Sequence, residues 1–329
     1  MEVLKTLPAE MKELAKGVYA FLQPGGGWVS NSGLIIGKKW ATVFDSLTNK
    51  YQVESLISKI KEVNDKPIRF LVNSHYDPDH TFTNHYFPDA ITIATKAQRD
   101  ETMRLHPYLR TALPKLVPNM SFEGAKMTPQ DMTYEGKLTI YDGEREVQII
   151  DMGAGHTESD AVIYLPQEKI VFGGDICGFG KPWIVFLDKG SYHMIEVLNN
   201  LANFDAEQFV PGHGPTVMTR EQVAALAAKT IEFLIVMREE ARKCFNKGMT
   251  YQEAADKLDY SKLKKWGDKN SLYPFVYGNC FRAWKEFRGE SPLGSGHNLE
   301  DTMAKMFRNS DGTYPDRIDL GYTRPWEDW

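Results

Sequence analysis

The segment at residues 73–80 reads NSHYDPDH and places His75, Asp77, Asp79 and His80 within six positions. Carboxylates this close repel one another and raise each other's pKa, so the cluster is costly unless a cation lies within it. If the preceding strand extends through Asp77, side chains 75 and 77 share a face. Pro78 then favours a turn that presents 79 and 80 to a neighbouring point. The spacing suits two metal ions, although a polar surface loop is an alternative on spacing alone.

Three later segments add metal-competent side chains. His156 lies in GAGHTESD, Asp175 in VFGGDI and His213 in VPGHGP, and each follows an apolar segment typical of a strand. Loops that follow strands gather at one edge of a sheet, so we expect these three residues to meet the first four. The other histidines have no clustered partners and are expected to be structural or at the surface: His85, His106, His193 and His297.

The order HYDPDH, GHT, GGD and PGHG resembles the metallo-β-lactamase superfamily, whose signature is H-x-H-x-D-H followed by a histidine, an aspartate and a histidine. The resemblance covers about residues 17–220, and SNSGLIIG and VFDS are similar to the opening strands of that family. It implies an α/β fold, a four-layer αββα sandwich of two mixed β-sheets. It implies no particular substrate, because the superfamily includes lactamases, thioesterases, lactonases, phosphodiesterases, sulfatases and redox di-iron proteins.

Carried over position by position, the resemblance implies two divalent ions. Their ligands would be His75, Asp77 and His156 for the first ion, Asp79, His80 and His213 for the second, and Asp175 as the bridge. The departure is at residue 77, where the family usually has histidine. A carboxylate there makes the first site harder, which favours manganese or iron over zinc. Asp45 in VFDS is expected to orient a ligand.

Two divalent ions that share Asp175 would lower the pKa of a bridging water and supply hydroxide near neutral pH. We therefore expect a metal-dependent hydrolase whose metal-bridging hydroxide attacks a small carbonyl-type substrate: an ester, thioester, amide, lactone or cyclic ketone. Asp79 is the expected catalytic residue, because it can orient the nucleophile.

Two alternative functions stay open. Asp77 also resembles the flavodiiron branch, which uses glutamate at this position, so a di-iron protein that binds or reduces dioxygen is the first alternative. No flavodoxin-like segment follows in this sequence. A non-catalytic metal-binding regulator is the second.

Composition limits the partners. The 39 basic and 44 acidic residues are spread along the chain, so no basic stripe indicates nucleic acid. The first residues are charged throughout, and apolar runs such as FLIVM are too short to span a bilayer. Three cysteines lie far apart, which is typical of reduced thiols. We expect a cytoplasmic protein with neither a nucleic-acid nor a membrane partner.

The expected elements divide the chain in two. Residues 1–218 should form the catalytic domain, with an antiparallel meander from residue 17, a helix over residues 49–65, and strands from 137 to 175. A helical insertion, broken by proline, is expected at about 98–130 and should form part of the substrate wall.

Residues 219–329 should form a helical C-terminal extension and tail. Thr219 with Gln222, and Thr250 with Glu253, have the spacing of capping boxes that begin helices. The aromatic residues of this region are expected to line the pocket of a small-molecule substrate or to form a homodimer interface. They include Trp266, Tyr273, Phe275, Tyr277, Phe281 and Trp284.

Overall fold

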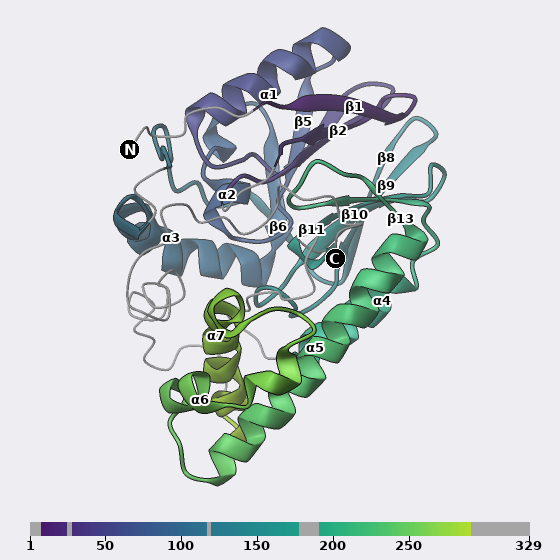
Figure 1. The fold of residues 1–329 in the computed structure, drawn as a ribbon. Coiled ribbons are helices and arrows are strands. Elements are labelled where there is room, and N and C mark those ends of the chain that lie inside the picture. Colours follow the sequence, from purple (N-terminus) through teal and green to yellow (C-terminus); the bar gives the residue numbers. More distant parts are fainter. Residues whose placement is uncertain (1–7, 25–27, 117–119, 178–190, 291–329) are drawn as a thin grey trace.

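A computed structural model describes residues 8–24, 28–116, 120–177 and 191–290, and Figure 1 shows their arrangement. Two mixed sheets pack face to face with helices outside them, as the αββα prediction requires. The first sheet has seven strands in the order β1-β2-β3-β4-β5-β6-β7, and the second has six in the order β13-β12-β11-β10-β9-β8. The predicted α/β sandwich is therefore confirmed.

The first sheet changes from antiparallel to parallel at its middle. Strands β1 to β4 pair antiparallel, and β4 to β7 pair parallel. The meander predicted from residue 17 corresponds to β2, β3 and β4, whereas β1 was not predicted. Its members are β1 (Glu10–Ala15), β2 (Val18–Leu22), β3 (Ser32–Ile36), β4 (Ala41–Phe44), β5 (Ile68–Val72), β6 (Ile91–Thr95) and β7 (Met132–Tyr134). The charged edge strand β1 shows no alternation in its sequence, so its pairing with β2 decides its conformation.

The second sheet is antiparallel except where β11 and β12 run parallel. It consists of β8 (Lys137–Asp142), β9 (Arg145–Asp151), β10 (Ala161–Leu165), β11 (Ile170–Gly174), β12 (Gln208–Pro211) and β13 (Met218–Thr219). Alternating side chains of β11 serve two cores: Ile170 and Phe172 face the first sheet, whereas Val171 faces the outer helices. The sheets approach so closely at Gly33 that a Cβ there would lie 2.5 Å from the Phe172 ring.

Helices cover both outer faces. Helix α1 packs Val53, Leu56 and Ile60 on the first sheet, and α4 and α5 cover the second. The helices are α1 (Lys50–Val63), α2 (Pro78–Thr81), α3 (Lys96–Leu116), α4 (Ser191–Ala202), α5 (Arg220–Asn246), α6 (Tyr251–Lys257) and α7 (Lys269–Phe287), with 3-10 turns at η1 (Asn84–Tyr86), η2 (Asp175–Cys177) and η3 (Tyr260–Leu263). Among the described residues, no helix combines the length and the apolar character that a membrane span needs.

The prediction of a proline-broken helix near residues 98–130 was wrong in one respect. Helix α3 runs unbroken through Pro107 and Pro114 and ends at Leu116, and residues 120–130 contain no helix. Each proline removes a backbone hydrogen bond from the helix. The helix is stabilised nonetheless because Leu105, Leu109 and Leu113 are buried in a cluster with Tyr76 and Phe82.

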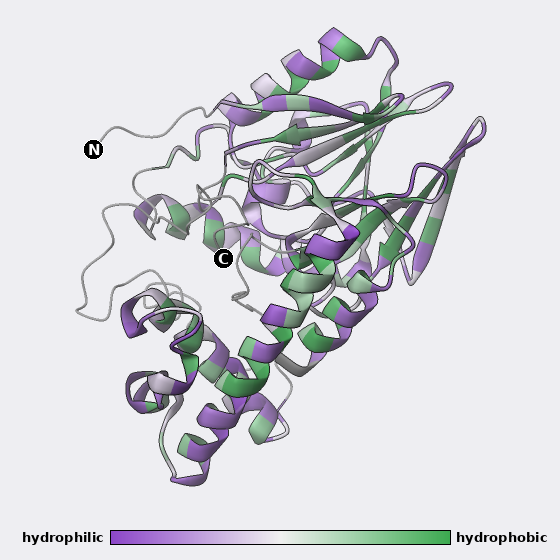
Figure 2. Cartoon of the chain, turned by 45° about the vertical axis from the view of Figure 1, so that its right-hand side comes forward, coloured by the Kyte–Doolittle hydropathy of each residue, from purple (hydrophilic) through white to green (hydrophobic). Residues whose placement is uncertain are grey.

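The C-terminal helices begin where the sequence predicted. Both capping boxes, at Thr219 and Thr250, are present. Figure 1 shows α5 running from the second sheet toward α6 and α7, and in Figure 2 its ribbon carries both hydrophilic and hydrophobic residues. The buried residues of α5 recur three or four positions apart, from Val223 to Cys244, which is typical of a helix that packs on one side.

Three of the aromatic residues have a role that differs from the expected pocket wall or dimer interface. Trp266, Tyr277 and Trp284 are buried in the core that α5, α6 and α7 share with α4. The Trp266 ring meets the Phe233 ring edge to face, with centroids 5.4 Å apart. These residues fill the interior of a bundle, because several helices, rather than one, need packing partners. The predicted tail from residue 291 lies outside the described residues.

Candidate metal centre

The HYDPDH segment leaves the first sheet earlier than the sequence suggested. Strand β5 ends at Val72, so His75 and Asp77 lie beyond it and strand alternation does not orient them. Asp77 has φ −58° and ψ 145°, the extended conformation that a following proline favours. Pro78 is the first residue of the one-turn helix α2, and this turn carries Asp79 and His80.

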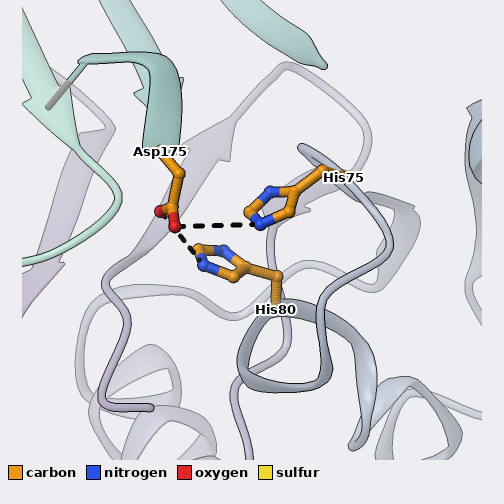
Figure 3. A group of neighbouring side chains, drawn as sticks. All are labelled: His75, His80 and Asp175. Carbon is orange, nitrogen blue, oxygen red and sulfur yellow. Dashed lines mark ion pairs between the residues drawn. The ribbon is translucent and has the colours of Figure 1, made fainter. Parts of the chain in front are cut away.

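The other three candidate ligands come from the second sheet. His156 lies in the connection from β9 to β10, Asp175 follows β11 directly, and His213 lies just beyond β12. Figure 3 shows Asp175 approaching His75 and His80 from the opposite sheet. All seven residues predicted as ligands therefore meet at one edge of the sandwich, where each sheet supplies part of the cluster.

Four donor atoms form a first group, which we call half-site A: Nε2 of His75, Oδ2 of Asp77, Nε2 of His156 and Oδ2 of Asp175. Asp77 Oδ2 lies 3.3 Å from His75 Nε2 and 3.0 Å from His156 Nε2. Asp175 Oδ2 lies 3.8 Å and 3.5 Å from the same two nitrogens.

A second group, half-site B, consists of Oδ2 of Asp79, Nε2 of His80, Nε2 of His213 and Oδ1 of Asp175. Asp79 Oδ2 lies 3.5 Å from His80 Nε2 and 3.2 Å from His213 Nε2. Asp175 Oδ1 lies 3.2 Å and 3.3 Å from those nitrogens. Asp175 thus gives one oxygen to each half-site, the arrangement of a bridging carboxylate.

The donors fit a pair of divalent ions. Four ligands at the usual 2.0–2.1 Å from a tetrahedral ion are separated by about 3.3 Å, which is close to the distances within each half-site. Nε2 of His75, Nε2 of His80 and Oδ1 of Asp175 are buried and have no hydrogen-bond partner among the described residues. Buried polar atoms are normally satisfied, so their convergence indicates a cation. Imidazole and carboxylate donors suit zinc, manganese or iron.

Hydrogen bonds behind the rings turn the Nε2 atoms toward the centre. His213 Nδ1 donates to the Val29 carbonyl oxygen at 3.0 Å, and this acceptor requires the proton on Nδ1. His80 Nδ1 lies 2.8 Å from Asp45 Oδ2, so this ring also donates through Nδ1. Each Nε2 then carries a lone pair that can bind a metal. The prediction that Asp45 orients a ligand matches this contact.

The cluster shifts the pKa values of its members in opposite directions. Burial lowers the pKa of His213, but Asp175 and Asp79 outweigh it and raise that pKa to about 9. His156 has its pKa raised to about 9 by Asp77 and Asp175, again against burial. Burial raises the pKa of Asp77 and Asp175, but the histidines hold both well below the usual range. Protons on the histidines therefore compete with metal ions for this site.

Several supporting residues were not predicted. Asn31 donates from its side chain to the carbonyl oxygens of Pro211 and Gly214, at 3.0 Å and 2.7 Å, and so fixes the His213 loop to the first sheet. At Gly212 a Cβ would lie 2.0 Å from Asp175 Oδ1, so only glycine leaves room for the Asp175 carboxylate in this position. The polar SNS segment between two apolar segments was a sequence signal that could have indicated a supporting role for Asn31. The Gly212–Asp175 contact had no such signal, because the two residues are distant in sequence.

The other histidines that the structure describes lie outside the three groups of candidate ligands. His106 on α3 is buried and its Nε2 donates to the Tyr76 carbonyl oxygen at 2.6 Å, so it has the structural role predicted for it. His85 is half-buried and His193 is exposed. His297 lies outside the described residues.

Comparisons with known proteins agree with this geometry. The sequence model of the metallo-beta-lactamase superfamily matches residues 25–213. A linear primary-alkylsulfatase from Pseudomonas sp. (strain ATCC 19151) is 21% identical over 251 residues, which are 63% of this chain and 46% of that protein. The chain thus spans about half the length of this curated relative.

Solved structures share the fold at low sequence identity. A stereoselective inverting sec-alkylsulfatase from Pseudomonas sp. is 17% identical with a TM-score of 0.66, over 88% of this chain and 52% of that chain. A beta-lactamase domain protein from Burkholderia ambifaria is 15% identical with a TM-score of 0.62, over 86% and 90% of the two chains. A metallo-beta-lactamase from Pontibacter korlensis is 18% identical with a TM-score of 0.53, over 69% and 99%.

Proposed function

The chain belongs to the metallo-beta-lactamase superfamily, and from this membership we propose that it is a hydrolase with two divalent ions held by its seven clustered ligands. The observation that carries the proposal is the position of Asp175, whose two oxygens each approach a different pair of histidines at 3.2–3.8 Å. A single ion would need only one of these groups. The buried donor atoms of His75, His80 and Asp175 support the same assignment.

The bound ions and the residues of the chain would have separate roles in catalysis. When bound, a pair of divalent ions activates water at neutral pH and polarises the bond that is cleaved. Asp79 directs Oδ2 toward His80 and His213, and we assign its second oxygen to accept a hydrogen bond from the attacking water. Asp45 and the Val29 carbonyl oxygen keep the His80 and His213 rings in place during turnover.

A small neutral carbonyl compound is the proposed substrate class: an ester, thioester, amide, lactone or cyclic ketone. The ligands Asp77, Asp79 and Asp175 bring a formal charge of −3, which two divalent ions at +4 convert to +1. Histidine at residue 77 would leave +2. The lower charge weakens the attraction for an anionic group but still polarises a neutral carbonyl.

A sulfate ester is the second candidate substrate. Its support is the 21% identity to a linear primary-alkylsulfatase and the shared fold of a sec-alkylsulfatase. The two substrate classes differ in charge at the reacting group, so one experiment separates them.

The test uses two substrates with the same chromogenic leaving group, p-nitrophenyl acetate and p-nitrophenyl sulfate. We expect the metal-loaded chain to hydrolyse the acetate with a higher kcat/KM, and Asp175→Asn to lose this activity together with bound metal. Faster hydrolysis of the sulfate would replace the carbonyl proposal with the sulfatase one. Hydrolysis of neither, by a chain with both ions bound, would contradict the proposed function.

A di-iron protein that binds or reduces dioxygen is the second candidate function. The Asp77 carboxylate supports it, because it lies 3.0 Å and 3.3 Å from two histidines in a donor set that iron accepts. Metal analysis and an absorption spectrum of protein purified without air would distinguish the two functions. Iron-oxo bands that change on exposure to oxygen would favour a di-iron protein. Zinc or manganese without such bands would favour the hydrolase.

A further inference from the structure

We propose that the two half-sites are chemically matched, so that they bind two ions of the same divalent metal with comparable affinity and do not sort different metals. The proposal rests on the binuclear centre proposed above and adds how that centre selects its ions. It follows from the donor atoms that Asp77 and Asp79 contribute to the two halves.

The donor sets are equal in kind. Each half-site has two imidazole Nε2 atoms and two carboxylate oxygens, one of which comes from Asp175. Each also takes one histidine and one aspartate from the HYDPDH segment and its second histidine from the other sheet. Histidine at residue 77 would give three imidazoles in half-site A against two in half-site B, and Asp77 removes that difference.

The distances are equal to within a few tenths of an ångström for the unshared carboxylates. Asp77 Oδ2 lies 3.0 Å and 3.3 Å from its two histidine nitrogens, and Asp79 Oδ2 lies 3.2 Å and 3.5 Å from its own. The Asp175 oxygens lie 3.5–3.8 Å from the nitrogens of half-site A and 3.2–3.3 Å from those of half-site B. The two half-sites therefore match in the spacing of their unshared carboxylates and differ by up to 0.6 Å in the spacing of Asp175.

Burial and support are also similar in the two halves. The exposed fraction of every ligand is between 0% and 5%, so solvent does not distinguish the half-sites. One carboxylate supports a histidine in each: Asp45 accepts directly from His80 and, through the Ser74 hydroxyl, connects to His75. Donor type and burial therefore give a metal no basis for preferring one half-site.

Loading with two metals tests the proposal on the full chain. Metal-free protein receives one equivalent of Zn²⁺ and one of Mn²⁺, and native mass spectrometry counts the doubly loaded species. The total number of ions then equals the number of sites. If the half-sites do not discriminate, about half of the doubly loaded protein should carry one Zn²⁺ and one Mn²⁺, whichever metal binds more tightly. Sorting half-sites would instead accumulate the mixed species, and a mixed fraction above about three quarters would overturn the proposal.

The variant Asp77→His provides the matched control. It should restore a three-imidazole half-site that prefers zinc, so its mixed fraction should rise well above that of the native chain. An unchanged mixed fraction in folded Asp77→His would show that residue 77 does not decide selectivity and would also overturn the proposal.

A second measurement compares the half-sites one at a time. His156→Ala damages half-site A and His213→Ala damages half-site B, and each variant should keep one Mn²⁺ with a Kd within about threefold of the other. A difference above about tenfold would contradict matching. Circular dichroism shows whether each variant is folded, and the mixed-metal experiment on the native chain decides the matter if one is not. These readouts are independent of turnover, so a failed substrate test leaves them interpretable.

Discussion

Asp45 Oδ2 accepts a hydrogen bond from His80 Nδ1 at 2.8 Å, so the carboxylate that directly follows β4 orients a ring of the candidate metal centre. The same carboxylate also accepts from Ser74, through its backbone nitrogen and its hydroxyl, each at 2.7 Å. Asp45 has φ 61°, a left-handed conformation that aspartate tolerates better than most residues. Asp45 therefore combines a left-handed backbone conformation with a hydrogen bond that orients the His80 ring.

We expect Asp45→Asn to weaken metal binding by about 10–100-fold. An amide has one acceptor oxygen, whereas the Asp45 carboxylate accepts from three donors: the Ser74 backbone nitrogen, the Ser74 hydroxyl and His80 Nδ1. Competition with a chromophoric chelator measures the affinity. Asp142→Asn is the control: Asp142 is a buried carboxylate that accepts from the backbone of Lys39 and Trp40. That variant should lower the melting temperature and leave metal affinity unchanged, and equal effects of both variants would refute the orienting role.

Asp77→His should raise the preference for zinc over manganese by at least about tenfold, because imidazole replaces a hard oxygen donor. Paired titrations with the two metals on both proteins give the ratio. Asp77→Asn keeps an oxygen donor but loses its charge, so it should bind both metals more weakly without a gain for zinc. The same ratio in all three proteins would mean that Asp77 is not a ligand.

Gly212→Ala should abolish binding of both ions in a folded protein. The new methyl group would lie 2.0 Å from Asp175 Oδ1, so the bridging carboxylate has to move away from its histidines. Gly248→Ala is the control, since a Cβ added there would meet no atom within 4 Å and the φ of 75° costs only backbone strain. Inductively coupled plasma mass spectrometry measures the metal, and two retained ions in Gly212→Ala would disprove the contact.

The metal-free chain should become less stable as pH rises from about 6.5 to about 9. The pKa values of His156 and His213 are raised to about 9, above the ordinary value near 6.5, so their protonated forms stabilise the fold at low pH and this contribution disappears through pH 9. Metal replaces those protons, so the gain in melting temperature on adding metal should increase over the same range. A gain that falls with pH would contradict this linkage.

Trp266→Ala should reduce the free energy of unfolding by about 3–5 kcal/mol and leave metal content and substrate preference unchanged. The ring is 8% exposed and packs on Phe233, so its removal opens a cavity between helices. Phe281→Ala, at a half-buried position of α7, should cost less. Chemical denaturation gives the free energies, and altered substrate preference at constant stability would restore the pocket role that the sequence suggested.

Local signals predicted most of the fold. Short β-rich segments separated by glycine, proline or GKK predicted the meander. The Thr219–Gln222 and Thr250–Glu253 spacings predicted two helix starts, because capping depends on residues three apart. The same reasoning failed where distant contacts decide the outcome. Pairing with β2 makes Glu10–Ala15 a strand, and packing under α3 keeps Pro107 inside a helix.

The candidate ligands could be predicted because metal chemistry restricts the residue types and the loops follow recognisable strands. Their supports could not. The Asn31 side chain reaches carbonyl oxygens at 211 and 214, and Gly212 is needed only because Asp175 lies against it. No rule of sequence spacing predicts such pairs, because the topology of the two sheets brings the residues together.

The division of the ligands between the two sheets also sets an order of events during synthesis. Four ligands leave the ribosome together at residues 75–80, whereas His213 emerges more than a hundred residues later. A nascent chain can therefore offer an ion only the donors of this one segment until its second sheet has docked on the first. Both half-sites are therefore complete only after the two sheets have docked, and an ion that arrives later must displace the protons that the raised pKa values keep on His156 and His213.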